Sequence, residues 1–148
     1  MKTKKSSFIR IIALCLALAL TSPITTNALE TDEIMPRASY YLDAYSSYVY
    51  VSTSGQVQVW FEVMGTDDMD EIGTLRIVLY ESSDGRNWSD VETFLYESTS
   101  DMLFYDDDYI ISHVSYQGTY GKQYKAYVTI WAGKNGNGDT RYIWSYMP

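Results

Sequence analysis

Apolar and polar residues alternate along most of the chain after residue 38. A period of two places successive side chains on opposite faces of a β-strand, so this pattern predicts strands. Residues 56–64 show it most clearly, with three valines and Phe61 on one face and Trp60 on the other. Residues 66–72 are the least strand-like segment and are expected to hold, at most, one helical turn. The expected strands cover residues 45–52, 56–64, 74–81, 91–97, 109–117, 123–132 and 141–146.

Turn-forming residues separate these segments. Ser54-Gly55 and Asp84-Gly85 suit tight turns, and glycine-rich stretches at residues 118–122 and 135–139 divide the last three strands. Seven short strands with this spacing predict a single all-β domain, an antiparallel two-sheet β-sandwich of immunoglobulin- or fibronectin-like topology. A small β-barrel is the structural alternative.

The sixth expected strand begins with a tyrosine on its inward face. Tyr124 shares that face with Ala126, Val128, Ile130 and Ala132. In immunoglobulin-like sandwiches a tyrosine at this place forms a corner, bonding through its hydroxyl to the backbone a few residues upstream. Ordinary core packing is the alternative interpretation of Tyr124.

The first 28 residues have the order of a secretory signal peptide. Four basic residues precede an apolar run at residues 11–20, and Thr26-Asn27-Ala28 supplies the small-x-Ala ending of a cleavage site. The apolar run is about half of the roughly 20 residues that a membrane-spanning helix needs. Cys15 lies inside this run and is expected to be removed with it. We therefore expect a secreted, extracellular protein.

After residues 1–28, residues 29–38 are expected to form a flexible leader and residues 39–148 the β-sandwich domain. Residues 144–148 contain no sorting motif, which favours release over retention on the cell wall. The sequence does not set the oligomeric state.

Signal cleavage makes the chain strongly acidic. All 19 acidic residues follow residue 28, whereas four of the 11 lysines and arginines precede it. The chain then has seven basic and 19 acidic residues, and its net charge changes from −8 to −12. Such a body repels phosphate backbones and anionic membrane surfaces, so we expect no nucleic-acid partner and no membrane association after cleavage.

Three stretches carry a resemblance to a known family. They are PRASYYL at residues 36–42, YESSDGRNW at residues 80–88, and residues 118–144, which include YKAYV and AGKNGNGDTRY. Together they resemble a family of small secreted proteins of Gram-positive bacteria classed as a domain of unknown function. The resemblance spans nearly all of the expected mature chain. It implies secretion and names no activity or site residue.

Candidate catalytic chemistry is sparse. His113 is the one histidine and lies within an expected strand, where we interpret it as a surface or satisfied strand residue. Zinc sites need several His, Cys or carboxylate ligands at short spacing, and no such group is present in the sequence. Glycosidases need two carboxyl groups positioned in a cleft, which a sandwich of this size rarely provides. A non-catalytic protein is therefore expected.

Calcium is a weak candidate cofactor. Asn135, Asn137 and Asp139 alternate as oxygen ligands do at the start of an EF-hand loop, but the closing glutamate is missing. The same residues suit a Gly/Asn hairpin turn with positive φ, which is the favoured interpretation. We therefore expect no bound cofactor.

Aromatic residues are the most informative feature. Fifteen tyrosines and four tryptophans exceed what a core of this size absorbs. Alternation predicts that Tyr80, Tyr127, Trp131 and Trp144 point outward from three neighbouring strands, where they would form one aromatic sheet face that binds a ligand. The alternative is cross-strand packing that only stabilises the sheet.

The resulting hypothesis is a secreted, non-catalytic module that binds a glycan or an extracellular protein through this face. A structural, self-assembling cell-surface protein is one alternative function. A secreted effector or antibacterial polypeptide is another.

Overall fold

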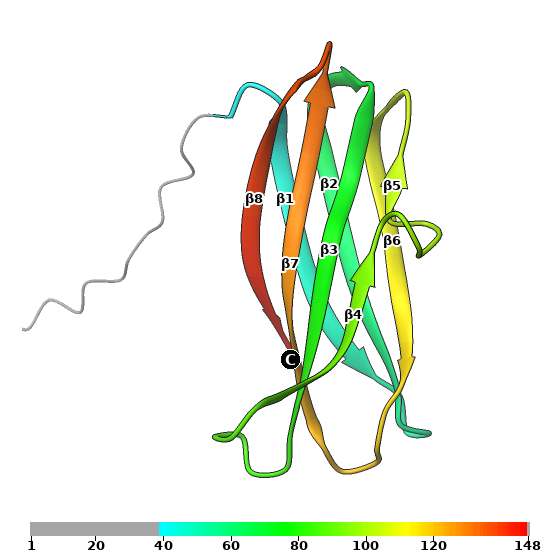
Figure 1. The fold of residues 1–148 in the computed structure, drawn as a ribbon, viewed down its shortest axis with the longest axis vertical. Helices are drawn as coiled ribbons and strands as arrows, with labels where there is room; N and C mark the ends of the chain where they lie inside the picture. Colours follow the sequence, from blue (N-terminus) through cyan, green and yellow to red (C-terminus); the bar gives the residue numbers. More distant parts are fainter. Residues whose placement is uncertain (1–38, 148) are drawn as a thin grey trace, which may run out of the picture. The chain divides into compact units, whose positions relative to one another are not determined.

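The computed structural model describes residues 39–147, which form two antiparallel sheets (Figure 1). The predicted signal peptide at residues 1–28 and leader at residues 29–38 lie outside the described residues. One sheet has the strand order β1-β2-β6 and the other the order β4-β3-β7-β8, with β5 also paired to β3. The strands are β1 Leu42–Val51, β2 Gln56–Met69, β3 Glu71–Ser82, β4 Ser89–Leu95, β5 Leu103–Phe104, β6 Asp107–Gln117, β7 Gln123–Lys134 and β8 Asn137–Tyr146.

The two sheets enclose one apolar core. Alternate residues of β2 are buried from Val57 to Val63, and alternate residues of β7 from Tyr124 to Ala132. Their inward side chains pack together with Ile77 and others of β3 in one cluster. The predicted β-sandwich is therefore confirmed, and the barrel alternative is wrong because the sheets form two separate sets of hydrogen-bonded strands. Within residues 39–147, no helix is long and apolar enough to cross a membrane.

The predicted helical turn at residues 66–72 is wrong. β2 runs on through Met69, and β3 starts two residues later, at Glu71. Met69 and Ile72 are both buried, so core packing holds this segment in strand conformation despite its run of acidic residues. The short strand β5 was not predicted. Its two residues pair with Ile72 and Gly73 of β3.

The tyrosine corner is confirmed. The hydroxyl of buried Tyr124 accepts a hydrogen bond from the backbone N–H of Thr119 at 2.7 Å, five residues upstream. It donates to the Oε2 atom of Glu81 at 2.7 Å. Burial and the Glu81 contact raise the pKa of Tyr124 above its usual value. The β6–β7 turn is thereby fixed to the end of β3.

Candidate functional site

The outward face of β3, β7 and β8 carries the predicted aromatic residues. The three strands are neighbours, as expected from the pattern, with β7 in the centre. Lys125 of β7 is aligned with Tyr80 and Tyr146, and Tyr127 is aligned with Trp144. The partly buried Ile143 packs against the core, so its neighbours on β8 point away from the core.

Trp144 is the centre of the aromatic cluster, defined here as Tyr80, Tyr127, Tyr142, Trp144 and Tyr146. Its ring centroid lies 4.9 Å from that of Tyr127, 5.5 Å from that of Tyr80 and 6.5 Å from that of Tyr146. The rings of Tyr127 and Tyr142 are nearly parallel, with centroids 6.0 Å apart. Three of the four predicted site residues, Tyr80, Tyr127 and Trp144, therefore form one group.

The cluster rings lie across the sheet. Tyr80 belongs to β3 and Trp144 to β8, and β7 separates these strands. Neighbouring strands are about 4.8 Å apart, so the two side chains start roughly 10 Å apart. They reach a centroid distance of 5.5 Å because both lean over β7.

Lys125 and Trp88 complete the cluster, although neither was among the predicted site residues. The Lys125 ammonium lies 4.5 Å from the ring centroid of Trp88, 4.7 Å from that of Trp144 and 5.8 Å from that of Tyr80. Alternation from Tyr127 placed Lys125 on the outward face, so that signal was present in the sequence. Trp88 precedes β4 in a turn, where no periodic pattern indicates its direction. A shallow hollow of about 350 Å³ adjoins Trp88 and Tyr146.

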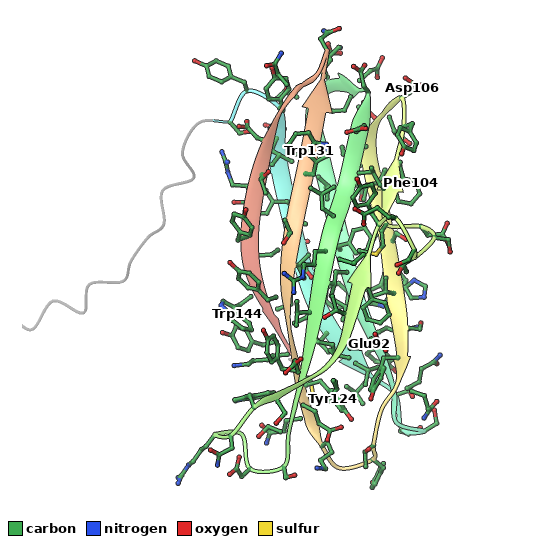
Figure 2. The ribbon with its side chains drawn as sticks, viewed as in Figure 1. Glu92, Phe104, Asp106, Tyr124, Trp131 and Trp144 are labelled. Atoms are coloured by element: carbon green, nitrogen blue, oxygen red, sulfur yellow. The ribbon has the colours of Figure 1, made fainter. Side chains whose placement is uncertain are left out.

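Trp131 lies apart from the cluster. It is four residues beyond Tyr127 on β7, a separation of about 13 Å along a strand. Figure 2 shows Trp131 and Trp144 toward opposite ends of the sheet. The Trp131 indole N–H donates to Oε2 of Glu71 at 3.1 Å, and the ring lines a separate polar hollow of about 360 Å³ with Asp70 and Lys134. The fourth predicted residue thus does not join the other three.

The opposite sheet carries a second aromatic group that the sequence interpretation did not assemble. Tyr48, Trp60 and His113 are aligned across β1, β2 and β6. The ring centroids of Trp60 and His113 are 4.4 Å apart at an interplanar angle of 24°, and Tyr48 and Trp60 are 6.3 Å apart at 7°. Aromatic pairs between aligned residues of neighbouring strands stabilise a sheet. This group therefore stabilises its sheet, and His113 is a packed strand residue.

The predicted calcium candidates have structural contacts. Asn135 adopts φ 55° and Gly136 φ 74°, and they form the two-residue turn between the paired ends Lys134 and Asn137. Such a turn requires positive φ at both positions, as the hairpin interpretation expected. Asp139 Oδ2 accepts hydrogen bonds from the Ser39 hydroxyl and from the backbone N–H groups of residues 40 and 41. Among residues 39–147, no three His, Cys, Asp or Glu side chains gather to hold a metal ion.

Replacing Asp139 with alanine is expected to destabilise the domain by about 1 kcal/mol at neutral pH, because three charge-assisted but partly exposed hydrogen bonds are lost. The Ser39 hydrogen bond, together with the backbone donors, holds the pKa of Asp139 below its usual value of 3.8. Its contribution is therefore present above about pH 4 and is lost as the pH falls further. Urea denaturation at pH 7 and pH 3 measures both effects. Asp67→Ala, which removes an exposed partner of Lys134, should cause a smaller change.

Comparisons with known proteins give little similarity. No family model matches the chain, and no curated protein matches it. Among solved structures, the sporulation control protein Spo0M from Bacillus subtilis is similar with a TM-score of 0.39 and 9% sequence identity. The similarity covers 70% of this chain and 48% of the Spo0M chain. This chain therefore spans about half the length of Spo0M.

Proposed function

We propose that this chain is a secreted, non-catalytic module that binds a polysaccharide through the aromatic cluster on β3, β7 and β8. The observation that carries the proposal is the group of rings around Trp144, which come from three strands and remain partly open to solvent. Tyr142 is 61% exposed, Tyr146 58% and Trp144 44%. Aromatic side chains with exposed faces and polar edges suit stacking against sugar rings.

Several properties support the same proposal. The expected signal peptide and the resemblance to small secreted Gram-positive proteins support an extracellular role, and glycans are abundant outside the cell. The strand order, β1-β2-β6 opposite β4-β3-β7-β8, supports an immunoglobulin- or fibronectin-like topology, an architecture common among cell-surface domains. Contiguous exposed aromatic surface of this kind on a small domain favours an interaction site over unused surface.

The test is retention of the purified chain on insoluble polysaccharides and isolated cell walls, with and without calcium. We expect retention on at least one polymer. Trp144→Ala should weaken it by about tenfold or more, because a central aromatic contributes most of the binding energy at such sites. Tyr142→Ala should weaken it less and leave the folded domain intact, since Tyr142 is exposed and its ring contacts only Tyr127 among the described aromatic pairs.

Trp60→Ala is the matched control, because it removes a tryptophan from the opposite sheet. Its retention should equal that of the wild type, and thermal unfolding of each variant checks the fold. Equal losses for Trp60→Ala and Trp144→Ala would contradict the proposed face. If the wild type is retained on no polymer, the proposal fails. Light scattering at increasing concentration would then show whether the rings serve self-assembly instead.

A further inference from the structure

The Lys125 ammonium lies against three aromatic rings and is not paired with an acid of the described residues. It contacts rings from three segments, namely Tyr80 of β3, Trp88 before β4 and Trp144 of β8. Among residues 39–147, no carboxylate lies within ion-pair distance of it, and no hydrogen bond holds it. Two other lysines on the same domain do pair with acids, Lys122 with Glu81 and Lys134 with Asp67.

The outward residues of β7 and β8 around Lys125 include no acidic side chain, although the domain as a whole is acidic. The outward residues of β7 are Lys125, Tyr127, Thr129, Trp131 and Gly133, and those of β8 are Tyr146, Trp144, Tyr142, Thr140 and Gly138. Two acids flank this face. Asp90 of β4 is aligned with Tyr80, and its backbone is two strands, or roughly 10 Å, away from that of Lys125. Glu71 of β3 accepts the Trp131 indole N–H at the other end of β7.

A second cation lies at the other end of the cluster. Arg76 of β3 is exposed and is aligned with Thr129, which in turn is aligned with Tyr142. Thr129 is four residues beyond Lys125 on β7 and Arg76 is one strand away, so the backbone positions of the two cations are about 14 Å apart, with the aligned pair Tyr127 and Trp144 between them. A chain whose negative charges repeat along its length can contact both. Because the net charge of the domain repels such a chain at long range, these two cations would hold it by local contact, within the roughly 8 Å over which charges act at physiological salt.

We infer that the ligand of the aromatic cluster is an acidic polysaccharide whose sugar rings carry carboxylates, as in a polyuronate. This inference rests on the proposed function and names its ligand class. Sugar rings would stack on the exposed tyrosines, and a carboxylate would accept hydrogen bonds from the free N–H groups of Lys125. One lysine at the centre suits a singly charged carboxylate, whereas phosphate is usually bound by several cationic groups or by arginine forks.

Polygalacturonate and its fully methyl-esterified form are the probes, because they share a backbone and differ in charge. Affinity electrophoresis of the purified full chain through gels that contain each polymer gives the dissociation constants. We expect the wild type to bind polygalacturonate about tenfold more tightly than the ester, and added salt should reduce this preference. Lys125→Gln should remove the preference, and Lys125→Arg should keep most of it.

Lys122→Gln is the matched control, since it also removes one positive charge but from a lysine paired with Glu81. It should keep the preference for polygalacturonate. Equal binding of both polymers by the wild type, or an unchanged preference in Lys125→Gln, would overturn the inference. So would binding to neither form, or tighter binding to dextran sulfate than to polygalacturonate. Retention on a neutral polymer that Trp144→Ala abolishes would still support the proposed function, so the two failures are distinguishable.

Discussion

Gly73→Ala is expected to destabilise the domain by about 3 kcal/mol or more, a large part of the stability of a typical small domain. Gly73 has a φ of 146°, and a Cβ atom there would lie 2.2 Å from the backbone oxygen of Met102. That oxygen also accepts the N–H of Thr74 at 2.7 Å. Met102 is buried, so the colliding backbone cannot move outward without opening the core.

Gly136→Ala separates the collision from the backbone conformation. Gly136 also has positive φ, 74°, but no atom lies within 4 Å of the position that a Cβ would occupy. The substitution should cost only the strain of a left-handed backbone, about 1 kcal/mol. Urea denaturation of both variants gives the two free energies of unfolding. If the two substitutions lowered the free energy of unfolding equally, the collision with Met102 would add nothing to the cost of Gly73→Ala.

The strands that bury one face could be predicted from the sequence, because burial of one face makes apolar and polar residues alternate along the strand. All seven predicted strands are present, and β2 and β7 show the expected buried faces. The strand β5 could not be predicted in this way, because its two residues are too few to show a period. Its position depends on the approach of Met102 to β3, a contact between distant segments that no local pattern encodes.

The candidate site was predicted in part for the same reason. Alternation gives the face of a side chain but not the register between neighbouring strands, which decides the rings that it meets. Tyr127 and Trp131 share a face of β7, yet only Tyr127 contacts Trp144. The cation at the centre of the cluster was missed because a lysine on a strand is ordinarily interpreted as solvated. Lys125 becomes part of the site only because β3, β8 and the segment before β4 bring three rings against its ammonium.

Tyr124→Phe should destabilise the domain by about 2–3 kcal/mol at pH 7. The substitution keeps the buried ring but removes the hydroxyl that accepts from Thr119 and donates to Glu81, each at 2.7 Å. A buried hydrogen bond to a charged group contributes about 1.5–3 kcal/mol, and the Thr119 N–H would lose its partner. Chemical denaturation at a series of pH values measures the difference in unfolding free energy between the two proteins.

The difference should depend on pH with a definite sign. The Tyr124 hydrogen bond holds the pKa of Glu81 below its usual value of 4.5, so the stabilisation is present above about pH 4.5 and is lost as the pH falls. The pKa of Tyr124 is raised above 10.0, so the stabilisation is complete below pH 10 and is lost as the pH rises further. The difference in unfolding free energy between the wild type and Tyr124→Phe should therefore be largest between about pH 4.5 and pH 10.

Tyr109→Phe is the matched control for this prediction. The Tyr109 hydroxyl also donates to a glutamate, Oε1 of Glu62, at 2.7 Å, but the ring is 40% exposed on the outer face of its sheet. Water replaces that bond when the hydroxyl is removed, so the change in unfolding free energy should stay below about 0.5 kcal/mol. Equal losses for the two variants would mean that burial and the link to Thr119 add nothing. The tyrosine corner would then be a packing feature rather than the clamp that joins the β6–β7 turn to β3.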